Sequence, residues 1–404
     1  MKHPGNPDLR PAKYVLNSRK LSQKIPLNAR LQDLLPGMGH FVLKACTSWN
    51  NHWQVQKTRN PAGRMKPTNL KETLLCLVLF TFFIVWAAPL SYAQDAPLEE
   101  DSVYYSLSKE NDAFADRDKR YTSGVRLSTL RAEEKIPGVF RRSLFRLPFF
   151  PEPGKKRLGF HIGQKMFTSD DISQKNPPKD ERPYAGWLYT GIQLTSDTGD
   201  RLDQFEITLG MVGDYSLAEE TQTFFHDLLG DQEPQGWHTQ LKNEPGIILA
   251  YQRKWQAEKR VNHDPAVAVD FSPHAGGTVG NIYTHLALGG MFRAGFNLPE
   301  DYGPPVISPS FMGSNFFVPS DSFGGYLFAG LEGRAVGRNI FLDGNTFRDS
   351  RSVDKKHLVG DIVGGVVFTF NSFRLAYTHV LRTKEFDAQD GIDNYGAVTI
   401  TARF

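Results

Sequence analysis

Apolar and polar residues alternate in many short segments after residue 94, and this pattern restricts the folds that the chain can adopt. Short alternating segments are bounded by Gly, Asp, Asn or Pro, and little of this region has helical period. A period of two places successive side chains on opposite faces of a β-strand. An even number of antiparallel strands can close into a barrel. We predict twelve strands, over residues 103–108, 124–130, 157–165, 186–195, 203–212, 246–255, 266–275, 281–294, 324–336, 358–370, 373–381 and 395–404.

The last of these segments shows what surrounds the predicted barrel. One face of it is apolar, the other is polar, and its final residue is aromatic. A strand with lipid outside and a polar lumen inside has this pattern, although a soluble β-sandwich can end the same way. The apolar face holds Phe404, Ala402, Ile400, Val398 and Gly396, and the polar face holds Arg403, Thr401 and Thr399.

One continuously apolar stretch, residues 74–88, is short for a helix that must cross about 30 Å of hydrocarbon. Met65, Lys66 and Lys71 stand before it and the small-residue site Ser91-Tyr92-Ala93 follows it. This order predicts a cleaved signal peptide over 65–93, the alternative being an uncleaved signal anchor. Residues 1–64 are then a basic disordered leader, or an over-extended reading of a gene that begins at Met65, and residues 94–404 form the barrel domain.

Charge and cysteine content narrow the functional classes. The sequence has 47 basic residues (Lys and Arg) and 44 acidic residues (Asp and Glu). Residues 1–64 hold 11 basic and 2 acidic residues, and residues 65–93 hold 2 basic residues and 1 acidic residue. Residues 94–404 therefore have a formal charge of −7, which argues against nucleic-acid binding. Both cysteines, Cys46 and Cys76, precede residue 94, so thiol catalysis, thiolate metal sites and disulfides are excluded there. With the signal and the 12% aromatic content, this favours an all-β, antiparallel transmembrane β-barrel of the outer membrane.

Three polar clusters follow odd-numbered predicted strands and are expected at one rim, over residues 109–124, 168–186 and 223–245. If the chain enters from the periplasm, this rim faces outside the cell. Residues 131–156 and 295–323 then form long periplasmic connections.

The first and third clusters hold candidate catalytic groups. Asn111 and Asp112, with hydroxyls nearby, offer the hard oxygen donors that Ca²⁺ prefers, although such residues also cap turns. Histidine side chains titrate near neutral pH, so His226 could act as a general base; the alternative is a purely structural role. His238 and Glu244 form a second possible pair. The EF-hand, G-x-S-x-G, H-E-x-x-H and P-loop motifs are absent from the sequence.

These clusters resemble those of the outer-membrane lipid A deacylase (LpxR) family. The similarity extends over about residues 101–404 and rests on several motifs in a fixed order. They are Glu110-Asn111-Asp112, Arg120-Tyr121-Thr122-Ser123-Gly124, Asp180-Glu181-Arg182-Pro183-Tyr184-Ala185-Gly186, His226-Asp227-Leu228-Leu229-Gly230, residues 236–245, Gly280-Asn281-Ile282-Tyr283-Thr284 and Leu342-Asp343-Gly344-Asn345-Thr346.

The resemblance implies a twelve-stranded barrel that hydrolyses the ester of the 3′-acyloxyacyl group of lipid A with Ca²⁺. Lipid A and outer-membrane lipids are the expected partners, and we expect a monomer, although the sequence does not fix the oligomeric state. By the same resemblance, Asn111, Asp112 and Thr122 match site positions around the metal, and His226 matches the catalytic histidine. Lys175 is our match for a basic site residue. Gln232 stands six residues after His226, where the family prototype has Glu.

Arg182, before Pro183-Tyr184, could orient an anionic phosphate or pin its loop. We expect Lys175 and Arg182 to hold the phosphates of lipid A. Three other functions remain open at this stage. A porin or other channel predicts conductance, but twelve strands are fewer than the 16–18 of typical porins. A serine phospholipase would need a pair such as Ser123 and His226. A purely structural barrel would leave the polar clusters unexplained.

Overall fold

The computed structural model describes residues 102–111, 123–133, 154–230, 232–260, 267–307 and 309–404. The predicted leader and signal peptide lie outside these ranges. The described strands are β1 Val103–Asn111, β2 Ser123–Ala132, β3 Lys155–Phe167, β4 Ala185–Asp197, β5 Arg201–Val212, β6 Glu244–Trp255, β7 Ala257–Arg260, β8 Val267–Gly280, β9 Tyr283–Phe296, β10 Phe323–Asn339, β11 Leu358–Phe370, β12 Phe373–Arg382 and β13 Asp393–Arg403.

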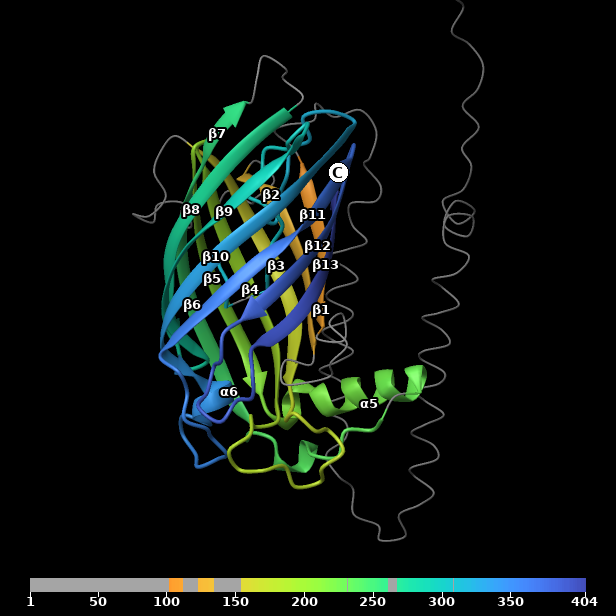
Figure 1. Ribbon diagram of the computed structural model, residues 1–404, viewed down its shortest axis with the longest axis vertical. Coiled ribbons are helices and arrows are strands. Elements are labelled where there is room, and N and C mark those ends of the chain that lie inside the picture. Colours follow the sequence, from red (N-terminus) through yellow and green to blue (C-terminus); the bar gives the residue numbers. More distant parts are fainter. Residues whose placement is uncertain (1–101, 112–122, 134–153, 231, 261–266, 308) are drawn as a thin grey trace, which may run out of the picture. The chain divides into compact units, whose positions relative to one another are not determined.

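These strands form one closed antiparallel barrel (Figure 1). Apart from β6 and β7, each strand pairs with its neighbours in sequence, and β1 pairs with β13 to complete the circle. β6 and β7 flank Gln256 and both pair with β8, so they form one interrupted strand of the wall. The wall therefore has twelve strands, which confirms the predicted fold and strand number.

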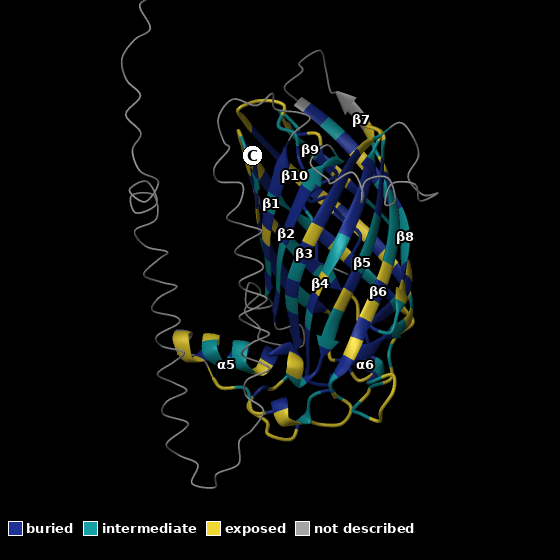
Figure 2. Ribbon diagram, turned by 180° about the vertical axis from the view of Figure 1, so that it is seen from behind, coloured by how far each residue is buried: buried dark blue, intermediate teal, exposed yellow. Residues whose placement is uncertain are grey.

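The two faces of each strand meet different surroundings. Figure 2 shows exposed residues spread along the strands between buried ones. On β11 the exposed set is Leu358, Ile362 and Phe368, and the buried set is Val359, Val363 and Val367. A wall that presents leucine and phenylalanine outward is suited to hydrocarbon rather than water. The period-two pattern thus places an apolar surface where lipid surrounds a membrane barrel.

Charged side chains inside the barrel hold neighbouring strands together. Asp361 of β11 accepts two hydrogen bonds from Arg334 of β10, at 2.8 Å each, and two from Arg382 of β12, at 2.9 Å each. Because every one of these charges has a partner, the low-dielectric interior does not leave them as isolated charges.

The segment between β9 and β10 folds back into the lumen. Its Tyr302, Phe316 and Phe317 are buried, and Arg374 of β12 donates to the Ser314 carbonyl at 2.8 Å. The Ile307 amide reaches Glu110 Oε1, near the far end of β1, at 2.7 Å. The segment is a long connection between β9 and β10, as expected, but the buried part of it lies in the lumen and not outside the barrel. Inward packing buries its aromatic residues and pairs its polar groups.

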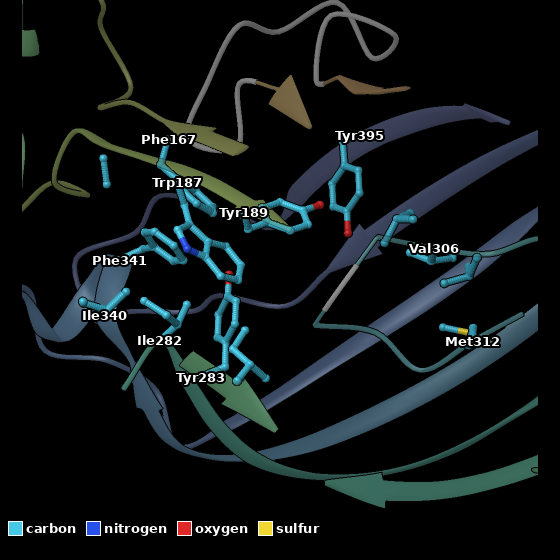
Figure 3. Close-up of a cluster of buried hydrophobic side chains, with 14 of the residues drawn as sticks. Phe167, Trp187, Tyr189, Ile282, Tyr283, Val306, Met312, Ile340, Phe341 and Tyr395 are labelled. Atoms are coloured by element: carbon cyan, nitrogen blue, oxygen red, sulfur yellow. The ribbon is translucent and has the colours of Figure 1, made fainter. Parts of the chain in front are cut away.

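Figure 3 shows where this inward segment meets the main hydrophobic cluster. Val306 and Met312 belong to the same buried cluster as Trp187 and Tyr395 of the wall. The rings of Trp187 and Tyr189 stack with centroids 4.6 Å apart. These side chains occupy the part of the lumen that is water-filled in a porin. The arrangement therefore does not favour the channel alternative.

The rim opposite the C-terminus carries the helices (Figure 1). They are η3 Asp214–Ser216, α5 Ala218–Leu229, η4 Trp237–Thr239 and α6 Ile340–Asp343. The second and third polar clusters lie at this rim, and Asn111 and Ser123 bound the undescribed centre of the first. Among the residues that the structure describes, no helix combines the length and apolar character needed to cross a membrane.

Candidate functional site

The predicted metal site begins where β1 ends at the helix-bearing rim. Asn111 pairs with Ser123 of β2, which in turn pairs with Met166 of β3. Leu107, Lys109 and Asn111 alternate along β1 and therefore share one face of the strand. Leu107 is exposed, so this face and the row of Asn111 lie on the outside of the wall. Lys109 Nζ donates to Ser123 Oγ. The serine that a phospholipase mechanism would require is therefore next to an ammonium group.

Two predicted site residues, Asp112 and Thr122, lie outside the described residues. Asn111 and Ser123 nevertheless place amide and hydroxyl oxygens on one outer surface, next to both ends of that segment. Such hard oxygen donors suit Ca²⁺. Within the described ranges, no group of three or more His, Cys, Asp and Glu side chains is gathered for a metal. The predicted Ca²⁺ site remains a prediction that depends on Asp112.

The first residues of helix α5 contact this outer wall, and the rest of the helix extends away from the strands (Figure 1). It begins after Leu217, has Glu219 and Glu220 in its first turn, and ends at Gly230, which has a left-handed φ of 76°. Acidic residues near a helix N-terminus and glycine after its C-terminus both favour this span. Ala218 at the start of α5 is buried in a small cluster with Met166, Tyr184 and Trp237. The helix is thereby attached to the lipid-facing side of the barrel and not to its lumen.

Gly186 of β4 permits this attachment. A Cβ at this position would collide with Ser216 Oγ and with the Cβ of Ala218. We expect Gly186→Ala to displace the start of α5 while the barrel still forms, because the collision involves the helix side only. Hydrogen exchange of α5 amides should rise at least about tenfold, which corresponds to roughly 1.4 kcal/mol of local opening.

The matched control is Gly364→Ala on β11, where the nearest atom to the added Cβ is the Phe328 carbonyl oxygen at 3.7 Å. This variant should leave α5 exchange unchanged. Equal α5 protection in Gly186→Ala and wild type would show that the helix does not depend on this close approach.

His226 lies in the last turn of α5 and its ring is held in a defined orientation. Nδ1 lies 2.5 Å from the main-chain carbonyl oxygen of Gln232. A carbonyl only accepts, so Nδ1 carries the proton and the neutral ring keeps its lone pair on Nε2. Nε2 is 3.5 Å from Gln222 Nε2, and Gln222 Oε1 accepts from Trp237 Nε1 at 2.8 Å. His226 is 8% exposed.

Gln232 contacts His226 through its main chain, while its side chain is exposed. The sequence comparison concerns the side chain at this position, because this chain has Gln where the family prototype has Glu. The carbonyl that orients the histidine is present with either residue. A carboxylate is thus not needed for this particular contact.

The other predicted pair of polar residues is not brought together. His238 is exposed and lies 3.3 Å from Asn176. Glu244 instead accepts hydrogen bonds from Asn281, Asn345 and the Thr346 amide. Glu244 therefore connects loops at the rim.

The two predicted phosphate ligands have different surroundings. Lys175 is exposed in the loop between β3 and β4. Arg182 is only 2% exposed, donates to Glu385 Oε2, and lies over the rings of Phe167 and Phe386. Burial alone would raise the pKa of Glu385, but Arg182 and Arg382 outweigh it and lower this pKa. Arg182 can contact a phosphate only if this ion pair opens, so its predicted role stays untested.

Sequence reasoning did not single out Lys165 of β3. It is buried on the lumen side and lies in one cross-strand row with Gly124 and Glu110. The side-chain-free Gly124 separates the two charges, which attract one another across it. A lysine at an inward position of an alternating strand is the signal that identifies it. Lys165 and Glu110 thus form a charged layer inside the wall, directly behind the Asn111 surface.

Comparison with known proteins identifies the family. A family model described as "Outer membrane protein LpxR" matches residues 75–404. The chain belongs to this family. Membership together with the closed barrel confirms the predicted family and the location in the outer membrane.

The solved structure of one family member supports the fold of this LpxR-family chain. LpxR from Salmonella typhimurium is 20% identical, with a TM-score of 0.60, and the match covers 74% of this chain and 99% of that one. The β-domain of the Bordetella autotransporter BrkA is 8% identical, with a TM-score of 0.35 and coverages of 75% and 98%. No curated protein sequence matches this chain.

Proposed function

We propose that this LpxR-family protein is an ester hydrolase that removes the 3′-acyloxyacyl group of lipid A with Ca²⁺. The observation that carries this proposal is the orientation of His226 on a helix attached to the lipid-facing wall. A substrate in the outer leaflet can approach that wall laterally. It therefore need not enter the lumen, which is filled by the segment between β9 and β10.

The proposed reaction is direct attack of water on the ester. His226 Nε2 removes a proton from water as the water oxygen attacks the carbonyl carbon. The histidine then returns this proton to the sugar oxygen when the ester C–O bond breaks, giving a carboxylic acid and a free hydroxyl. The Gln232 carbonyl holds the ring throughout, and it stabilises the imidazolium that forms between the two transfers. No serine acyl-enzyme is involved.

Asn111 and Asp112 would hold the Ca²⁺ ion, with Thr122 beside them. Bound there, the ion would polarise the ester carbonyl as a Lewis acid. Lys175 is the basic side chain that we assign to the developing oxyanion and to a substrate phosphate, because its loop is exposed at the same rim. Arg182 would join the phosphate contact only after leaving Glu385.

Mass spectrometry of lipid A tests this proposal. Cells that lack such an activity should produce the protein from Met65, with Ca²⁺ supplied or chelated. We expect lipid A to lose one acyloxyacyl unit only when Ca²⁺ is present, and Asp112→Asn to reduce this loss by about 10²-fold or more, as for removal of a transition-state contact. Asp171→Asn, a change at an exposed carboxylate of the neighbouring loop, is the matched control and should retain activity. Unchanged lipid A from a correctly inserted barrel would contradict the proposal.

A further inference from the structure

A second surface that suits a lipid lies on the wall opposite α5. Helix α5 contacts β3 and β4, and β10 and β11 stand six strands away in the order of the twelve-stranded wall. There, the outer faces of β9, β10 and β11 and the segment after β12 line a groove of about 850 Å³. This volume is in the range of ligand sites, roughly 300–1,000 Å³.

The floor of the groove is made by two glycines that pair with each other. Gly333 of β10 pairs with Leu288 on one side and with Gly360 of β11 on the other. The atom nearest to a Cβ at Gly333 would be a carbonyl oxygen 4.0 Å away, and at Gly360 a methyl carbon 3.6 Å away. Neither glycine is among those with positive φ. The backbone therefore does not require glycine here, although glycine weakens a strand interior.

Leucines form the sides of the groove. Leu286 and Leu288 of β9 are each 70% exposed, and Leu358 of β11 is 77% exposed. Ala335 lies between Leu286 and Leu358 in the neighbouring cross-strand row. Large apolar side chains on both sides of a floor without side chains create a trough, in which an acyl chain contacts atoms on three sides.

Two lysines stand at the end of the groove nearest the helix-bearing rim. Lys356 comes just before β11, Lys384 follows β12, and both line the groove. Lys356 pairs with Asp387, but their side chains are 45% and 60% exposed. An exposed pair of this kind contributes little stability, so a phosphate can displace the carboxylate. Two ammonium groups thus stand at one end of the groove, where a lipid headgroup would lie, and apolar side chains line the rest, where its chains would lie.

We propose that this groove binds one phosphorylated lipid A molecule of the outer leaflet without hydrolysing it. An acyl chain lies over Gly333 and Gly360, and a phosphate lies between Lys356 and Lys384. The site is separate from the proposed catalytic wall and does not depend on the proposed reaction. We infer that the ligand is a lipid because this face of an outer-membrane barrel contacts the bilayer.

Native mass spectrometry of the protein isolated from outer membranes tests the site. The detergent-solubilised protein would be titrated with bisphosphorylated lipid A and with its fully dephosphorylated form. Two double variants are informative. Gly333→Leu/Gly360→Leu fills the trough, and Lys356→Glu/Lys384→Glu reverses the charge. We expect each to bind one fewer lipid A molecule, or to weaken that binding at least tenfold. The wild type should bind the dephosphorylated form at least tenfold more weakly.

Matched controls separate this site from ordinary boundary lipid. Gly364→Leu adds the same side chain at an open position of β11 farther from the helix-bearing rim, and Lys242→Glu reverses an exposed charge elsewhere on this rim. Both should bind lipid A as the wild type does, and all variants should retain deacylation. Heat-modifiable electrophoretic mobility verifies the folded barrel. Equal lipid binding by all folded variants, an equal loss with Gly364→Leu, or a dimer mass that the trough variant abolishes would overturn the proposal.

Discussion

Replacing His226 by alanine is expected to lower lipid A deacylation by about 10²–10⁴-fold, the usual contribution of a positioned general base. The ring is held through Nδ1 by the Gln232 carbonyl, and Nε2 is the atom to which we assign the proton transfer. Of the other histidines at the described rim, His238 is exposed beside Asn176. His357 also has Nδ1 on a main-chain carbonyl, 3.1 Å from that of Val336, but its side chain is exposed. Initial rates on purified lipid A in detergent, at saturating Ca²⁺, would measure the effect on kcat and KM separately.

Gln232→Ala is the control that distinguishes the main chain from the side chain. It removes an exposed amide and keeps the carbonyl that contacts His226. We expect its kcat to stay within about threefold of the wild type, since exposed substitutions away from special contacts have small effects. A loss as large as that of His226→Ala would show that the side chain itself takes part. Near-normal turnover by His226→Ala would instead exclude the proposed general base.

The wall of the barrel was predictable because local pattern and environment agree. Alternation located all twelve strands, and the terminal residues from Gly396 to Phe404 show both faces clearly. The segment between β9 and β10 was not predictable in the same way. Its inward course depends on partners distant in sequence, such as Glu110 for Ile307 and Arg374 for Asp301. Polar residues and prolines there are equally compatible with a solvent-exposed connection.

The candidate site was only partly accessible to sequence reasoning. Motif resemblance selected Asn111 and His226, which the structure places at the outer rim and on the attached helix. It gave no means to find the Gln232 carbonyl, because every residue has a carbonyl and only geometry selects one. Lys165 was overlooked because Lys175, in a loop, has the more usual setting for a charged side chain. Buried charges become interpretable only when their partners across the barrel are known.

Arg182→Met is expected to destabilise the folded barrel by about 3–5 kcal/mol, because it removes one partner of a buried ion pair. Glu385 would keep the more distant Arg382, whose Nη1 lies 3.8 Å from Oε1, and the weaker attraction of Arg334. Equilibrium urea unfolding of the protein in lipid vesicles, followed by tryptophan fluorescence, measures the change. Glu385→Gln should be similarly destabilising, since it leaves Arg182 buried without this carboxylate.

The double variant Arg182→Met/Glu385→Gln separates a structural role from a substrate role. It removes both charges together, so we expect it to recover most of the lost stability, as replacement of a whole buried pair often does. Once this variant is folded, its preference for bisphosphorylated over monophosphorylated lipid A reports on phosphate binding. An unchanged preference would assign Arg182 to the support of the rim, whereas loss of the preference in a stable double variant would mean that the pair opens to hold substrate. The 2% exposure of Arg182 and its position between Phe167 and Phe386 lead us to expect an unchanged preference.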